Sequence, residues 1–284
     1  MVKSLILSLS FLLAWHSGFC QQPQNGKVAC DCSDKKVRDS LSNKYLDKGA
    51  FRYSYNSPEW QLYCDSLIAI CPNIAEAYQR KAIPYIKFGD YAKAFPLEDK
   101  AVELEPKNYT AYRGFLKCIF TKDYEGAIID FKKAQQLTPN SYEMDHTYPF
   151  YEGLCNLELG NYSLAEENFR KDILIQTGGD PEKQNKVHFN TFFYLGVLYY
   201  EMKQNDRAKE NLQKCILIYK AHPDANYYLG LLYARENNTA LRNKHLQVAK
   251  ESKLLNYDIN EDNIYYAYYP HQITLFEIED ALGK

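Results

Sequence analysis

The sequence predicts an all-α fold in which antiparallel helical hairpins stack into a solenoid. Its clearest unit is 75–108, AEAYQRKAIPYIKFGDYAKAFPLEDKAVELEPKN, where two apolar patterns of helical period meet at Gly89-Asp90 and stop at a proline. A spacing of 34 residues, as between Gly196 and Gly230, recurs along the chain. One such hairpin cannot bury its own apolar face, so each unit requires neighbours.

The first 20 residues, MVKSLILSLSFLLAWHSGFC, are typical of a cleaved secretory signal peptide. Lys3 supplies the positive charge at the start of the signal, and residues 4–15 form its apolar core. Ser17 and Gly18 are the small residues that suit a cleavage site. The apolar run is shorter than the roughly 20 residues that span a bilayer. We therefore expect export to the periplasm, the outer membrane or the cell surface, and no transmembrane span.

A lipid anchor at Cys20 is a second possibility. Bacterial lipoproteins carry a lipidated Cys after a signal of this type, usually with Leu three residues before it and a small residue directly before it. Ser17 and Phe19 stand at those places here. The pattern favours cleavage and leaves a lipid anchor open.

Residues 21–38 are expected to form a flexible leader with a cysteine-rich cap. Cys64 and Cys71 fall on one predicted helix about 10.5 Å apart, beyond the reach of about 7 Å that a disulfide tolerates. They cannot pair with each other, but Cys30 and Cys32 could pair with both. We predict two disulfides in either order, with free thiols and a four-cysteine zinc site as alternatives.

The repeat array begins at Asp39. Residues 39–73 fit a degenerate first repeat, as expected at an end of a solenoid. A loop of about ten residues after Gly178 is the largest insertion between the repeats. The five further hairpins are predicted at 75–108, 109–141, 146–179, 189–222 and 223–256.

The tail, 257–284, does not continue the repeat. Residues 273–282 fit a short amphipathic helix that would cap the last hairpin. The aromatic strip 264–269, IYYAYY, leaves open that the tail instead folds back and occludes the binding face.

The pattern of small and large residues in 75–108 resembles the tetratricopeptide repeat, a helical hairpin of about 34 residues. The small residues are Ala82, Ala94 and Ala101, and the large ones are Tyr78, Tyr85 and Tyr91. The resemblance implies a right-handed superhelix whose first helices line a concave, peptide-binding groove. Gln79 and Ile83 replace the Lys and Asn with which some relatives clamp a peptide carboxylate, so that clamp is unsupported.

At the matching groove places, the front of the array is polar with two cations and the back is apolar. An apolar groove suits an extended peptide or a helix with large anchors; the same residues could instead be core. The candidate groove residues are Arg113, Lys117, Phe120, Phe150, Leu154, Leu157, Phe193, Val197, Tyr200, Tyr227 and Leu231.

Composition and motifs argue against other functions. The net charge of −2 offers no basic excess for nucleic acid. No zinc-protease, P-loop or G-x-S-x-G motif occurs in the sequence, and the histidines are scattered, although His146 and His188 could meet across the third and fourth repeats. We therefore expect no catalysis, cofactor or metal. The predicted function is protein or peptide binding outside the cytoplasm, and the alternative is a structural or assembly factor of the cell envelope.

Overall fold

The structure is a computed structural model that describes residues 30–257 and 269–283. The predicted signal peptide, Cys20 and residues 264–268 of the aromatic strip lie outside this range. The described part confirms an all-α solenoid of helical hairpins. Its α-helices are α1 (Lys35–Ser42), α2 (Pro58–Ile70), α3 (Ala75–Lys87), α4 (Tyr91–Leu104), α5 (Pro106–Leu116), α6 (Tyr124–Leu137), α7 (Tyr148–Glu158), α8 (Tyr162–Thr177), α9 (Phe189–Glu201), α10 (Asn205–Ile218), α11 (Pro223–Arg235), α12 (Thr239–Leu254) and α13 (Leu275–Leu282).

Shorter elements connect these helices. The 3-10 helices η2 (Ala50–Arg52) and η4 (Pro181–Lys186) and the π-helices η1 (Asn43–Asp47) and η3 (Lys117–Thr121) lie in the links. Strands β1 (Tyr142–Glu143) and β2 (His146–Thr147) form a small antiparallel pair before α7.

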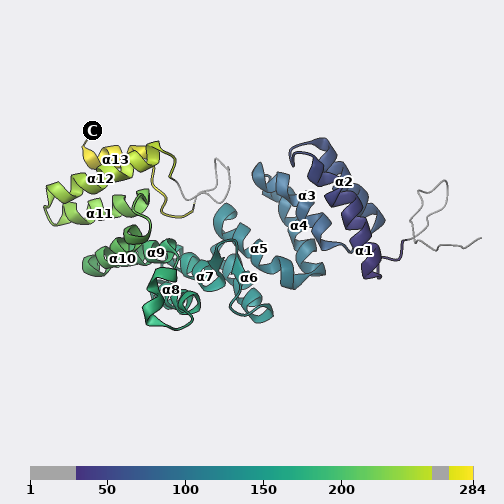
Figure 1. The fold of residues 1–284 in the computed structure, drawn as a ribbon, viewed down its shortest axis with the longest axis horizontal. Coiled ribbons are helices and arrows are strands. Elements are labelled where there is room, and N and C mark those ends of the chain that lie inside the picture. The colour runs from purple at the N-terminus through teal and green to yellow at the C-terminus, as the bar shows by residue number, and fades with distance from the viewer. Residues whose placement is uncertain (1–29, 258–268, 284) are drawn as a thin grey trace, which may run out of the picture.

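The hairpins follow one another in chain order, from α1 on the right of Figure 1 to α13 on the left. Each first helix packs against its second helix in the pairs α3–α4, α5–α6, α7–α8, α9–α10 and α11–α12. Each second helix then contacts the next first helix. The first helices α7, α9 and α11 also touch one another in sequence, so they form a continuous inner layer.

A common turn joins the two helices of each hairpin. One residue there has a positive φ, and the next is the N-cap of the second helix. Glycine adopts this conformation without steric cost, whereas a residue with a Cβ pays for it. The turn residues are Gly89, Lys122, Gly160, Lys203 and Asn237, with φ of 74°, 58°, 73°, 58° and 58°. Asp90, Asp123 and Asn238 then accept a hydrogen bond from a backbone N–H in the first turn of the second helix, which stabilises the helix start.

Small residues let the two helices of a hairpin approach closely. A Cβ on Gly196 in α9 would lie 2.6 Å from Cγ of Leu212 in α10, so no larger residue fits there unless α10 shifts. The gaps between hairpins are filled by aromatic rings. Phe131 and Tyr151 stack with ring centroids 4.8 Å apart, and Phe169 stacks on Tyr194 at 6.3 Å. One apolar core therefore runs from α3 to α11.

Two smaller clusters close the ends. At the N-terminal end Leu41, Leu46 and Trp60 pack with α2 and α3, and the indole Nε1 of Trp60 donates to the carbonyl of Arg80 at 2.9 Å. At the C-terminal end Ile278 of α13 packs on Ala249 of α12. Both clusters give the end hairpins a covered apolar face.

A disulfide joins Cys32 to Cys71, whose Cα atoms lie 5.7 Å apart. The segment is also held by Asn73, whose Nδ2 donates to the carbonyl of Cys32 at 2.8 Å. The expectation that Cys64 also pairs is wrong: Cys64 is a free, fully buried thiol. Its side chain points into the α2–α3 interface and is part of the N-terminal core. Burial raises the pKa of this thiol to about 12, so it is an unreactive packing residue.

We expect Cys32→Ser to lower the free energy of unfolding of the N-terminal hairpins by about 3 kcal/mol, because the bond closes a long loop in the unfolded chain. The separation of the two cysteines is 39 residues. Trp60 fluorescence during urea unfolding reports on this region, because Trp60 is the tryptophan of the same cluster. An unfolding midpoint and slope equal to those of the wild type would show that the bond does not contribute.

Candidate functional site

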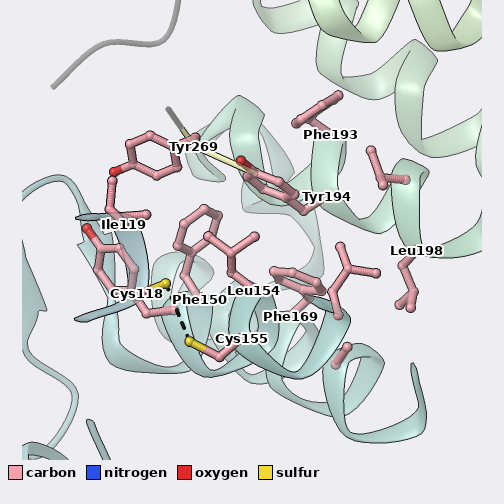
Figure 2. Close-up of a cluster of buried hydrophobic side chains, with 14 of the residues drawn as sticks. Cys118, Ile119, Phe150, Leu154, Cys155, Phe169, Phe193, Tyr194, Leu198 and Tyr269 are labelled. Atoms are coloured by element: carbon pink, nitrogen blue, oxygen red, sulfur yellow. Dashed lines mark hydrogen bonds between the residues drawn. The ribbon is translucent and has the colours of Figure 1, made fainter. Parts of the chain in front are cut away.

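Five of the eleven predicted groove residues lie inside the core, which corrects that part of the prediction. They are Phe150, Leu154, Leu157, Phe193 and Val197, each at most 4% exposed. Aromatic neighbours on both sides account for this. Phe150 contacts Phe169 of α8 and Tyr194 of α9, with ring centroids 6.0 and 5.7 Å apart, and Figure 2 shows these rings packed together. These residues therefore hold the repeats together and are not available to a ligand.

The two predicted groove cations are neutralised by an internal carboxylate. Arg113 and Lys117 both reach Asp130 of α6, at 2.5 and 2.8 Å, and Asp130 is 2% exposed. Arg113 also pairs with Asp99 at 2.7 Å. Phe120 is partly buried against Tyr91 and Phe115. A charge that already has buried partners is poorly placed to recruit an acidic ligand.

The remaining three residues, Tyr200, Tyr227 and Leu231, form a partly exposed surface on α9 and α11. Together with the neighbouring Arg235 they are here called the aromatic patch. The Arg235 guanidinium lies 4.0 Å from the centroid of the Tyr200 ring. Tyr200 also meets Tyr228 edge-on at 5.0 Å, and Tyr227 does so at 5.7 Å. The patch combines the residue types, Tyr and Arg, that are enriched in binding hot spots.

Next to this patch, residues 269–273, here called the inner-face segment, cross the first helices of three repeats. The Tyr194 hydroxyl in α9 donates to the carbonyl of Pro270 at 3.0 Å. His271 lies between α7 and α11: its Nε2 is 2.9 Å from Glu158 Oε1, and its Nδ1 is 3.0 Å from the hydroxyl of Tyr228. The Nδ1 contact is a hydrogen bond, whereas the Nε2 contact is a close approach of an ion-pair type, since Glu158 Oε1 has no hydrogen-bond partner in the described part of the chain.

The two ends of the inner-face segment are anchored as well. Tyr269 is 3% exposed and joins the main core near His146, with ring centroids 6.5 Å apart, and Figure 2 shows it among the side chains of that core. The backbone N–H of Ile273 donates to Asp224 Oδ1 at 2.9 Å. Asp224 lies 3.7 Å from Lys253. The segment is therefore tied to α7, α9 and α11 by both backbone and side chains.

The chain then continues into α13, which lies on α12. Lys250 pairs with Glu279 at 2.6 Å, and Arg242 donates to the carbonyl of Ala281. Arg242 stands where the repeat usually has Ala, and this contact gives the substitution a role. Capping of the last hairpin and coverage of the inner layer thus occur together, through different parts of the tail.

Several titratable side chains are buried in or against the inner layer. The rings of His146 and His188 are 4.6 Å apart, so the two histidines do meet. Burial lowers the pKa of both, and it lowers the pKa of His222 to about 3. Asp172 accepts hydrogen bonds from Thr147 and Thr191 at 2.7 and 2.6 Å, which joins α8 to the helices on either side.

Glu98 in α4 is fully buried, and neither carboxylate oxygen has a hydrogen-bond partner in the described part of the chain. Burial raises its pKa to about 8, and the charge of Arg113 opposes that rise only in part. Burial away from water disfavours the charged form of a carboxyl, so this side chain is neutral at neutral pH. Glu98 stands where the repeat usually has an apolar residue.

Within the described ranges, His, Cys, Asp and Glu form no group of three or more that could hold a metal ion. The buried thiols of Cys118 and Cys155 lie 3.4 Å apart, as Figure 2 shows, and link η3 to α7. A search of the same residues for a helix long and apolar enough to cross a membrane found none.

Sequence reasoning missed the residues that hold the inner-face segment: Glu158, Tyr194, Asp224, Tyr228 and His271. They lie in three repeats and the tail, and nothing in their local spacing connects them. The available signal was Pro270, because proline favours the second position of a tight turn, and the structure has such a turn here, with the Gln272 N–H donating to the Tyr269 carbonyl at 3.4 Å.

Comparisons with known proteins identify the repeat. Residues 191–221, which span α9 and α10, match the family model for the tetratricopeptide repeat. A comparison with curated protein sequences found no match.

Solved structures of the same architecture cover most of the chain. PilW, described as a widely conserved type IV pilus biogenesis factor, is 14% identical with a TM-score of 0.61 over 88% of this chain and 100% of its own. The pilF protein of Pseudomonas aeruginosa is 16% identical with a TM-score of 0.58, over 75% and 92%. The Cut9–Hcn1 heterotetramer of the APC/C is 14% identical with a TM-score of 0.58, over 87% and 44%. These likenesses confirm the predicted repeat fold.

Proposed function

We propose that this chain, a tetratricopeptide-repeat protein, is a non-catalytic scaffold that binds a protein partner outside the cytoplasm. The observation that carries the proposal is the aromatic patch. Tyr200, Tyr227 and Leu231 stay partly exposed on a layer in which most large apolar side chains are buried. Aromatic side chains with an adjacent Arg supply large contact area at small entropic cost.

The location is supported by the predicted signal peptide 1–20, whose composition is that of an exported chain. A role in assembly of the cell envelope is the second candidate. It is favoured by the similar fold of PilW, which is described as a pilus biogenesis factor. Fractionation of the native cells and the mass of the mature N-terminus separate the two, since an envelope factor with a lipidated Cys20 would partition with membranes.

We expect affinity capture from native envelope and culture fluid to retain a protein with the wild-type bait and to lose it with Tyr200→Ala/Tyr227→Ala. Two aromatic anchors of this kind contribute about 2 kcal/mol each, so the loss should exceed tenfold in bound protein. The matched control is Leu217→Ala, because Leu217 is 86% exposed on the second helix α10, away from the patch.

The captured protein is then purified and titrated against the three baits. Equal affinity for the wild type and the double variant, with unchanged helical content by circular dichroism, would exclude the aromatic patch as the binding surface. A partner that is also lost with Leu217→Ala would point to the outer face instead.

A further inference from the structure

The inner-face segment does more than cap the solenoid. Covering the last hairpin is the work of α13, through Ile278 on Ala249 and through the Lys250–Glu279 ion pair. Residues 269–271 instead lie on α7, α9 and α11, three first helices that other repeats already flank. An end cap requires no contact with Tyr194 or Glu158, which lie one and two repeats away from the last hairpin. These contacts therefore call for a different explanation.

The segment begins with a tight turn, in which the Gln272 N–H donates to the Tyr269 carbonyl at 3.4 Å and His271 has a φ of 61°. Two contacts from the repeats go to its backbone: the Pro270 carbonyl accepts from Tyr194, and the Ile273 amide donates to Asp224. These backbone bonds position the turn, and its side chains supply the selectivity. Here these side chains are Tyr269 and His271.

Each position of the segment has defined chemistry. Tyr269 places an aromatic ring in the core. Pro270 is buried and has no N–H that would need a partner there. His271 places its Nε2 2.9 Å from Glu158 Oε1 and is hydrogen-bonded to the Tyr228 hydroxyl through Nδ1. The surface therefore accepts, in order, an aromatic residue, a proline, a histidine and, two positions after the histidine, an aliphatic residue.

Without the segment, a buried hydroxyl group of the surface would lose its hydrogen-bond acceptor. The Tyr194 side chain is fully buried, and the acceptor of its hydroxyl is the Pro270 carbonyl. A buried hydroxyl that loses its acceptor is costly, so any state in which the segment leaves favours a replacement that brings a carbonyl to the same place. A competing peptide does so, whereas water alone restores only part of the contacts.

We infer that Glu158, Tyr194, Asp224 and Tyr228 form a peptide-recognition surface whose ligand is a protein segment that forms a tight turn with the pattern aromatic-Pro-His-x-aliphatic, and that Tyr269–Ile273 occupies this surface in cis. The inference rests on the proposed scaffold function and names the chemistry of one partner segment. Because the occupying segment is tethered to the same chain, its effective concentration is in the millimolar range. A partner must therefore compete with it, and the tail regulates access to the surface.

The test uses the full mature chain and a labelled synthetic peptide, Tyr-Pro-His-Gln-Ile-Thr, which copies residues 269–274. The released variant is Tyr269→Ala/His271→Ala, which removes both side-chain anchors from the tail. The matched control is Phe276→Ala, since Phe276 lies just beyond the segment and is 78% exposed. We expect the peptide to bind the released variant at least tenfold more tightly than the wild type or the control.

Two further arms establish where the peptide binds. Adding Tyr228→Phe to the released variant removes one hydroxyl and keeps the ring, and it should weaken peptide binding several-fold. A peptide with Ala in place of His should bind at least tenfold more weakly. In the wild type, excess unlabelled peptide should speed hydrogen exchange at the Ile273 amide and leave α7 and α9 unchanged. The hydrogen-exchange experiment needs no variant, so it still tests the inference even when the released variant folds poorly.

Equal affinity for the wild type and the folded released variant, or no binding to either, would overturn the inference and leave the segment as a structural strap. Unchanged exchange at the Ile273 amide under saturating peptide would do the same. These failures are distinct from failure of the scaffold proposal. A partner captured through Tyr200 and Tyr227, with no binding of the tail peptide, keeps the scaffold and removes only this assignment.

Discussion

Phe193→Asp is expected to unfold the C-terminal half of the solenoid. The Phe193 ring is fully buried and lies 4.8 Å from the His222 ring and 6.1 Å from that of Tyr228. His222 is held neutral by burial, which lowers its pKa to about 3, so it offers no positive charge to a new carboxylate. An unpaired buried charge together with the lost ring costs more than about 4 kcal/mol. Far-UV circular dichroism and limited proteolysis measure the loss of α9 to α12.

Phe193→Leu is the matched control, because it keeps an apolar side chain and should cost only about 1 to 2 kcal/mol. Tyr227→Asp should leave the helical content intact, since Tyr227 is partly exposed on α11. If Phe193→Asp instead kept the melting temperature of the wild type, Phe193 would be accessible to water, and the groove first expected from the sequence would be correct at this position.

The fold was predictable because it is repeated locally. Gly89-Asp90 and Asn237-Asn238 specify the same turn in hairpins far apart in the chain, and each turn needs only its own residues. The small residue at Gly196 likewise reports a close approach between helices that are adjacent in sequence. Every repeat independently indicates the same helical hairpin, so a wrong assignment in one repeat does not change the predicted fold class.

The groove was not predictable in the same way. The helical period shows which side chains share a face of a helix, but it does not show which other segments of the chain pack on that face. In α9 every residue from Thr191 to Tyr199 is buried. A helix that is apolar on all sides is a core helix, and TFFYLGVLY carried that signal. Its inner side is closed partly by Pro270, whose partner Tyr194 lies 76 residues earlier. Spacing within a repeat holds no information on such a contact.

Cys64 illustrates the same limit at the other end. The spacing argument correctly separated Cys64 from Cys71, since both lie on α2 or at its end. The spacing argument could not show which of these two cysteines points towards the N-terminal segment. Cys71 lies at the C-cap, where Cys32 can reach it, whereas Cys64 points into the core.

Glu98→Gln is expected to stabilise the protein increasingly as the pH rises. Burial raises the pKa of Glu98 from 4.5 to about 8, so between these values the folded chain holds a proton that the unfolded chain has released. The free energy of unfolding therefore falls as the pH rises through this window, by up to about 5 kcal/mol, and levels off above the folded-state pKa. Glutamine stays neutral at every pH and does not lose this stability.

The quantity to measure is the difference in free energy of unfolding between Glu98→Gln and the wild type, from urea unfolding between pH 5 and pH 8.5. His146, His188 and His222 have lowered pKa values, so their contribution is lost as the pH falls below about 6.5, with the opposite slope. These histidines are present in both proteins and cancel in the difference. The control Glu103→Gln lies on the same helix with a 67% exposed side chain, and its difference should stay near zero. A flat difference for Glu98→Gln would mean that Arg113 pairs with the Glu98 carboxylate despite its bonds to Asp130 and Asp99, and that the carboxylate is charged inside the core.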